Sequence, residues 1–178
     1  VHRLDRETSG ATGLARTRPA AAALSEAFRT GAVEKVYLAV CARSPEPRQG
    51  HLEAPLGPDP ARPGRRVVVA SGEPAATGWR TLAEAPGGGA ALVECRPETG
   101  RTHQIRAHLA HLGAPLLGDP RYGGPRRVLE TSIPRVLLHA RRLALAHPTT
   151  GAPLAFEAEI PADLDEVIRA LGIPHPQR

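Results

Sequence analysis

The front of the chain, from His2 to Gly10, is a run of charged and hydroxyl-bearing residues that could build a reaction centre. Asp5 stands beside Arg6 and two positions after Arg3. A carboxylate among guanidinium groups stays ionised, as an attacking nucleophile must. The alternative is an ion-paired surface loop, because charged loop residues are usually solvated. The run alone therefore indicates either a nucleophilic aspartate or a solvated loop.

A second segment, Glu98 to Leu109, could supply the partner that such a carboxylate needs. Its apolar spacing predicts a helix capped by Thr99, with one stripe formed by Ile105, Leu109 and Leu112. Arg101 then falls in the first turn, where a cation is electrostatically unfavourable. A buried carboxylate partner would explain it. For Arg106 and His108 the alternative is the basic outer face of an amphipathic core helix.

Four further stretches complete a collinear set of motifs, and together they resemble the RluA-type pseudouridine synthases over nearly the whole chain. Chance matches do not fall in a family's order and spacing. His2 before Arg-Leu-Asp favours this branch over the related small-subunit branch. The four stretches are Glu34 to Ala39, Gly72 to Thr77, Gly118 to Gly123, and Leu138 to Ala140 with His147 and Pro148.

The resemblance implies an isomerase that converts uridines of ribosomal or transfer RNA to pseudouridine. Asp5 would be the catalytic carboxylate, and it either attacks the sugar, attacks the base or assists proton removal. Arg101 would pair with Asp5 and fix its rotamer. Tyr37 would stack on the target base, with its hydroxyl near the C5 proton. Because the isomerisation is redox neutral, it implies no cofactor.

Substrate contacts follow from the same resemblance. Arg3 is the candidate for filling the gap that a flipped base leaves in its stack. Leu138 would form the apolar floor of the base pocket, although a leucine in a strand is equally well explained by core packing. His103 and Ile105 are the remaining residues that we place against the substrate.

Composition supports an anionic partner independently. The formal net charge is +5 over 178 residues, which favours RNA. Lys35 is the only lysine, but abundant Ala, Arg, Pro and Gly indicate a G+C-rich genome, so the net charge is more informative than the choice of arginine. Two scattered cysteines and no apolar span or leader predict a cytoplasmic protein. We expect a monomer without a membrane or metal partner.

The pattern predicts an α+β domain, a mostly antiparallel mixed sheet with flanking helices, with residues 1–178 as a single pseudouridine synthase catalytic domain. In the family a strand and a Lys-Pro-x-Gly segment precede the first motif, so we expect this domain to lack its N-terminal strand segment. Besides the segment described above, helices are expected at 20–29 and 162–171, and strands at 11–16, 33–42, 51–56, 66–70, 76–85, 90–96, 136–146 and 153–160.

The stretch from Ser44 to Arg66 is rich in Pro, Gly and Arg and predicts a surface excursion. Its arginines could clamp RNA phosphates, or they could belong to a solvated loop. These are Arg62, Arg65 and Arg66.

The sequence offers few residues for other kinds of chemistry. His103 and His108 are five positions apart, which is not a clean metal-ligand spacing, and no carboxylate lies among the histidines of that segment. The sequence also contains no Gly-x-Ser-x-Gly motif. Two functions therefore remain: an RNA-modifying isomerase that depends on Asp5, and a basic RNA-binding fragment without catalytic turnover.

Overall fold

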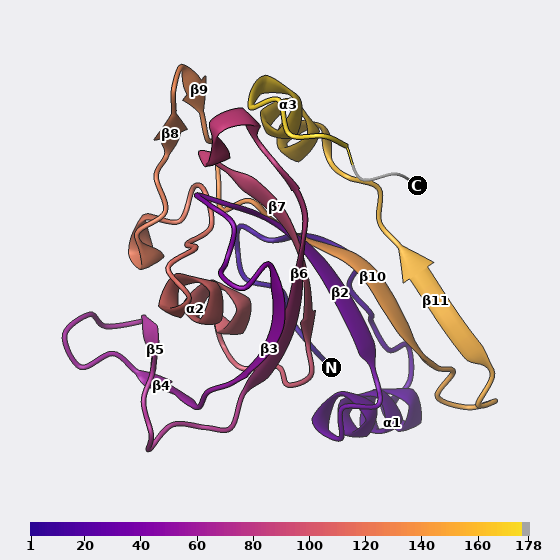
Figure 1. Cartoon of the computed structure of the whole chain (residues 1–178). Helices are drawn as coiled ribbons and strands as arrows, with labels where there is room; N and C mark the ends of the chain where they lie inside the picture. The colour runs from indigo at the N-terminus through magenta and orange to yellow at the C-terminus, as the bar shows by residue number, and fades with distance from the viewer. Residues whose placement is uncertain (176–178) are drawn as a thin grey trace.

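A seven-stranded mixed sheet is the frame of this computed structural model, which describes residues 1–175 (Figure 1). The strand order is β1-β10-β2-β7-β6-β3, and β11 also pairs with β10. Strand β1 runs parallel to β10, while the other pairings in this sheet are antiparallel. The strands are β1 (Ser9–Gly10), β2 (Glu34–Cys41), β3 (Gln49–Glu53), β6 (Ala76–Glu84), β7 (Ala91–Pro97), β10 (Leu138–Ala146) and β11 (Pro153–Glu157).

The helices and two small hairpins surround this sheet. The helices are α1 (Arg18–Arg29), α2 (Gln104–His111) and α3 (Ala162–Ala170), with short 3-10 turns at Pro86–Gly88 and Pro120–Tyr122. The hairpins are β4 (Leu56–Pro58) with β5 (Arg66–Val68), and β8 (Arg127–Val128) with β9 (Thr131–Ser132). The α+β class expected from the sequence is confirmed. Within residues 1–175, no helix is long and apolar enough to span a membrane.

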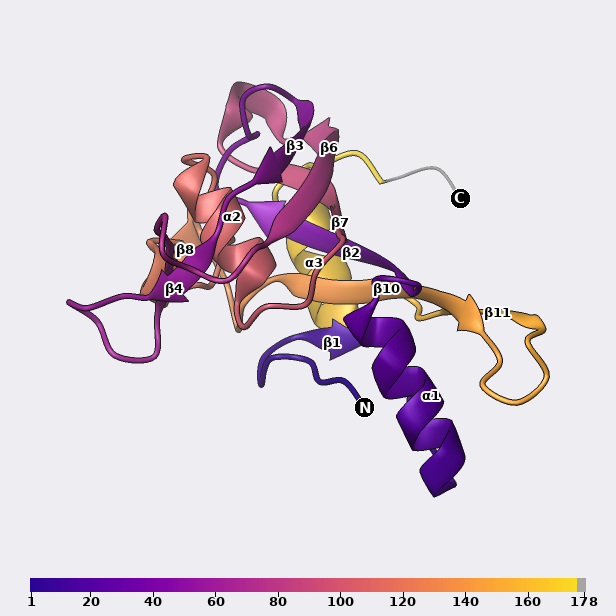
Figure 2. The ribbon, with the colours of Figure 1, turned by 90° about the horizontal axis from the view of Figure 1, so that it is seen from below.

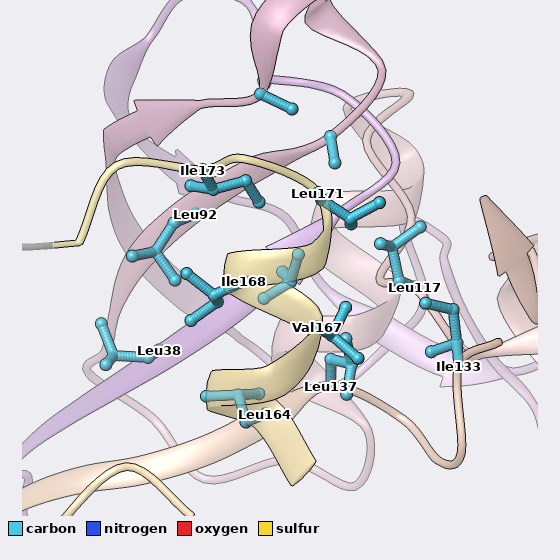
Figure 3. Packing of buried hydrophobic residues seen from close by; sticks show 13 residues of the cluster. Leu38, Leu92, Leu117, Ile133, Leu137, Leu164, Val167, Ile168, Leu171 and Ile173 are labelled. Carbon is cyan, nitrogen blue, oxygen red and sulfur yellow. The ribbon is translucent and has the colours of Figure 1, made fainter. Parts of the chain in front are cut away.

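Alternation along β2 divides the core into two faces. Leu38 and Val40 point to the face that is covered by α3, where Leu164 and Ile168 are fully buried (Figure 3). Each such side chain stabilises the fold by roughly 1.5–3 kcal/mol when it leaves water. Tyr37, Ala39 and Cys41 point to the opposite face, together with Ile105 and Leu109 of α2. The strand period of two therefore places Tyr37 beside α2.

The prediction of a strand at residues 11–16 is wrong. The N-terminal segment pairs with β10 only through Ser9 and Gly10, opposite His139 and Ala140. From Arg142 onward, the same edge of β10 is occupied by β11, so no partner is left for residues 11–16. Within the stretch 44–66, the strand expected at 51–56 is found at residues 49–53, where β3 forms the edge of the main sheet.

Gly10 attaches the Asp5 segment closely to the sheet, and Figure 2 shows β1 running beside β10. The φ angle of Gly10 is 117°, in a region that residues with a side chain rarely adopt. A Cβ atom at this position would lie 2.2 Å from the carbonyl oxygen of Ala140. A glycine is therefore required where the first motif joins β10.

We expect Gly10→Ala to lower the free energy of unfolding by about 1–3 kcal/mol, because the new Cβ is strained and displaces β1 from β10. The matched control is Gly89→Ala. Gly89 has a φ of −76°, and a Cβ added there would meet no atom within 4 Å, so alanine should be neutral or slightly stabilising. Urea denaturation of both variants measures the difference, and equal midpoints would contradict this account.

Candidate active site

Asp5 lies in a cleft formed by four segments that are distant in the sequence. The N-terminal segment brings Asp5, β2 brings Lys35 and Tyr37, the end of β7 with the start of α2 forms a third side, and β10 contributes Leu138. The residues that line the cleft are Leu4, Asp5, Thr8, Lys35, Tyr37, Pro97, Thr99, Gly100, Arg101, His103, Gln104, Ile105, Arg106 and Leu138. Every site residue predicted from the sequence except Arg3 therefore meets here.

The centre of the cleft is an arginine shared by two carboxylates. Arg106 donates from Nη1 to Oδ2 of Asp5 at 3.1 Å. Its Nε and Nη2 donate to the two carboxylate oxygens of Asp119, at 2.6 and 2.9 Å. Asp119 is fully buried and the Asp5 side chain is 24% exposed, so Asp5 is the carboxylate that faces the cleft. Burial opposes the charge on the guanidinium, but the bonds to Asp119 and then Asp5 outweigh it and raise the pKa of Arg106.

The predicted pairing of Arg101 with Asp5 is wrong. Arg101 donates from Nη1 to Oε2 of Glu73 at 3.0 Å and from Nε to the carbonyl oxygen of Pro74 at 2.9 Å. The partner of Asp5 is Arg106, because α2 begins at Gln104 and not near Thr99. Arg106 therefore occupies the first turn of the helix, where an arginine needs a carboxylate. The alternative of a basic outer face is also wrong for this residue, which is buried.

The Arg3 and Arg6 side chains, expected to hold Asp5 ionised, are both exposed. Arg3 lines a separate hollow beside the cleft, next to Phe28 and Lys35. Among residues 1–175, the cationic or titratable groups within ion-pair distance of Asp5 are Arg106 and His103. The partner of Asp5 thus comes from the distant helix α2 and not from its neighbours in the sequence.

Gln104 organises the loop that leads into α2. Its side-chain oxygen accepts from the Thr99 hydroxyl at 2.7 Å and from the Arg101 backbone N–H at 2.9 Å. Its amide nitrogen donates to Ala76 and Thr77 of β6. This buried glutamine therefore ties the loop to the sheet, a role that no local sequence pattern indicates. Thr99, expected as the helix cap, instead bonds to Gln104 and to the Ala76 N–H.

His103 immediately precedes α2 in a left-handed conformation, with φ at 57°. Such a conformation is uncommon for a residue other than glycine and is found at functional sites. Its Nε2 lies 3.9 Å from Oδ2 of Asp5, and its Nδ1 lies 3.0 Å from the Tyr122 hydroxyl. Burial and the positive charge of Arg106 lower the pKa of His103, although Asp5 opposes them. A neutral imidazole therefore sits beside the carboxylate.

The Tyr37 side chain extends from the face of β2 that borders the cleft. Burial, and then the negative charge of Asp5, raises the pKa of Tyr37 to about 12. The phenol therefore keeps its proton at neutral pH, and it serves the cleft as a hydroxyl and not as a phenolate. Two positions earlier, Lys35 donates to the backbone carbonyls of Glu98 and Thr99, at 3.4 and 3.0 Å. Burial lowers the pKa of this lysine.

The apolar side of the cleft is formed by Leu138 and Ile105. Both are buried and both belong to the core cluster on the α2 face of the sheet. For Leu138 the core alternative is confirmed, and because the leucine also lines the cleft, its role as the floor of a base pocket stays a prediction. The predicted apolar stripe of Ile105, Leu109 and Leu112 is confirmed.

The alternative of a basic outer face is wrong for His108 as well, because this residue is buried. It lies buried between the Thr77 hydroxyl at 2.9 Å and the carbonyl oxygen of Ala54 at 2.9 Å. In the part of the chain that the structure describes, no group of three or more His, Cys, Asp or Glu side chains is suited to hold a metal ion. Both cysteines, Cys41 and Cys95, are free and buried, and burial raises the pKa of each thiol.

Comparison with known proteins identifies the class to which this fold and cleft belong. A family model described as RNA pseudouridylate synthase matches residues 1–111, more than half of the chain. The chain therefore belongs to the RNA pseudouridylate synthase family. The structure of the human RNA pseudouridylate synthase domain containing 4 superposes with a TM-score of 0.79 at 28% identity, over 99% of this chain and 76% of that one.

Sequence relatives place the chain in the RluA-type branch, as the motifs suggested. An uncharacterized RNA pseudouridine synthase of Chloroflexus aurantiacus is 45% identical over 171 residues, covering 96% of this chain and 52% of the relative. The ribosomal large subunit pseudouridine synthase D of Zymomonas mobilis is 37% identical over 180 residues, covering 97% and 56%. The chain thus spans about half the length of these curated relatives.

The protonated state of Tyr37 is testable by absorbance. Tyr37 and Tyr122 are the two tyrosines of the chain, and both have a raised pKa. In a Tyr122→Phe variant we expect phenolate absorbance at 295 nm to rise near pH 12 in the folded protein, against about 10 in urea. Because the unfolded state loses its proton first, folding stability should fall as the pH rises from about 10. A midpoint near 10 in the folded variant would contradict the burial of this hydroxyl.

Proposed function

We propose that this chain is the catalytic part of an RNA pseudouridine synthase that isomerises uridines in ribosomal or transfer RNA, with Asp5 as the catalytic carboxylate. The observation that carries the proposal is the ion pair between Asp5 and Arg106 at 3.1 Å, at the base of a cleft that also holds Tyr37. Membership of the family supplies the reaction class. We propose that residues 1–178 act as one catalytic domain, which works as a monomer in the cytoplasm.

The reaction needs a positioned carboxylate. The N1–C1′ bond breaks, the uracil turns, and a C5–C1′ bond forms, while the proton on C5 is lost and N1 gains one. No electrons enter or leave. Asp5 is held and aimed into the cleft by Arg106, which supports either its attack on the sugar or base or its assistance in proton removal.

Tyr37 and the apolar side chains would hold the base. In the proposed complex the ring of Tyr37 stacks on the uracil, while Leu138 and Ile105 form the wall behind it. A phenol with a raised pKa cannot act as a preformed phenolate, so Tyr37 would help to transfer the C5 proton by passing it on through its neutral hydroxyl. His103, neutral and 3.9 Å from Asp5, would contact the substrate beside this carboxylate.

Arg3 is exposed at the hollow next to the cleft, a position compatible with the proposed role in base flipping. Arg101, expected as the catalytic partner of Asp5, lines the cleft without a direct bond to Asp5, and we propose for it instead a contact with RNA. The alternative function, RNA binding without turnover, needs the same positive surface but not the ion pair between Asp5 and Arg106. The two functions therefore differ in what they require of Asp5.

The first test is Asp5→Asn, which keeps the shape of the side chain and removes its charge. Ribosomal and transfer RNA labelled with tritium at C5 of uridine would be incubated with the wild-type protein and the variant. Wild type should release tritium, and the variant should release less by at least about a thousandfold. Tritium release at equal rates would refute the role of Asp5, and RNA binding without release from either protein would favour the binding function.

A second test separates stacking from proton transfer. Tyr37→Phe keeps the ring and removes the hydroxyl, so we expect kcat to fall by about 10²–10⁴-fold while the KM for RNA changes little. Tyr122→Phe serves as the control, since it also removes one buried hydroxyl but lies on the far side of His103 from Asp5. A loss of RNA affinity with unchanged kcat in Tyr37→Phe would show that the hydroxyl only binds substrate.

A further inference from the structure

The turn from Gly118 to Gly123 contains a buried carboxylate that the proposed chemistry does not use. Asp119 has no exposed surface, and both of its oxygens are bonded to Arg106. A fully buried carboxylate is costly unless it is paired. The same turn is one of the sequence motifs. We therefore ask what the Asp119 carboxylate does for Arg106.

The backbone of the turn does not depend on this carboxylate. The carbonyl oxygen of Asp119 accepts the N–H groups of Tyr122 and Gly124, at 3.1 and 2.8 Å. Gly118, with φ at 77°, fits against the carbonyl oxygen of Arg135 where a Cβ would lie only 1.8 Å away. Backbone bonds and a required glycine thus form the turn, and the carboxylate is left to act on Arg106.

The geometry of the guanidinium shows what that action is. The group is planar, and Asp119 holds two of its three nitrogens, Nε and Nη2, in a bidentate pair. With these nitrogens held, the plane cannot turn, and the remaining nitrogen, Nη1, is directed at Asp5 at 3.1 Å. A single bond from Arg106 to Asp5 would leave the guanidinium free to rotate.

We propose that Asp119 is a positioning residue of the reaction: it orients Arg106, and through Arg106 it fixes the rotamer of Asp5 in the cleft. The inference rests on the proposed function. Asp119 is buried, and it acts on Asp5 only through Arg106. Substitutions of Asp119 should therefore change kcat and leave RNA binding nearly unchanged. A misplacement of a reacting group by about 1 Å can cost on the order of a hundredfold in rate.

A double-mutant cycle in the full chain tests this, with tritium release from C5-labelled RNA as the rate and thermal unfolding as the measure of folding. Asp119→Asn should lower kcat by about 10- to 100-fold and leave the KM for RNA within about threefold. In an Arg106→Gln background, Asp119→Asn should lower kcat by less than about threefold more. If the effects of the two substitutions on kcat instead multiply, with rates compared for equal amounts of folded protein, the inference is overturned.

Arg106→Lys covers the case in which Asp119→Asn does not fold. A lysine keeps one positive charge between the carboxylates but lacks the planar fork that binds Asp119 and Asp5 together. We expect a folded protein whose kcat falls by at least about tenfold with little change in KM. Wild-type kcat in this variant would overturn the positioning role. A wild-type protein that releases no tritium would instead refute the proposed function, so the two failures are distinguishable.

Discussion

One guanidinium group, that of Arg106, joins the parts of this site. It is buried, and a buried cation is tolerated only when its charge and its donors are satisfied. Asp119 satisfies two of its nitrogens and Asp5 a third. Loss of either carboxylate would leave a buried charge unpaired, at a high cost in folding free energy. This cost fixes the positions of three segments relative to one another: the helix with Arg106, the turn with Asp119 and the segment with Asp5.

The sheet provides the common frame. Strand β2 carries Tyr37, and beyond it the Val40 carbonyl accepts from the Leu117 N–H at 2.8 Å, while Cys41 forms a bridge to Leu116. The chain then turns directly into Gly118 and Asp119. The carboxylate that holds Arg106 and the tyrosine of the cleft are therefore attached to one strand. Asp5 joins the same frame through β1, which pairs with the neighbouring strand β10.

Sequence patterns indicated the fold class, most elements and several residues that meet in the cleft, but they assigned the wrong arginine to Asp5. The argument that an arginine in a first helical turn needs a carboxylate was sound. The helix start was misplaced, because Thr99 looked like a cap and the left-handed His103 gave no local signal. Strand 11–16 failed for a different reason: its pairing edge is taken by β11, a contact between distant segments that local alternation cannot indicate. The role of Asp119 likewise depends on a long-range pair.

The charges of the cleft are separated from those of the molecular surface. Asp5 and Asp119 share Arg106, which leaves one negative charge, and the ammonium of Lys35 lines the same cleft. Arg101, which also lines the cleft, is paired with Glu73, so the interior of the site is nearly neutral, which would suit the uncharged uracil of the proposed reaction. The chain nevertheless carries a formal net charge of +5, and exposed arginines such as Arg3 and Arg62 contribute to it. Under the proposed function, the surface would attract the phosphate backbone of RNA, while the cleft would keep its carboxylate paired without drawing phosphate into the place of the base.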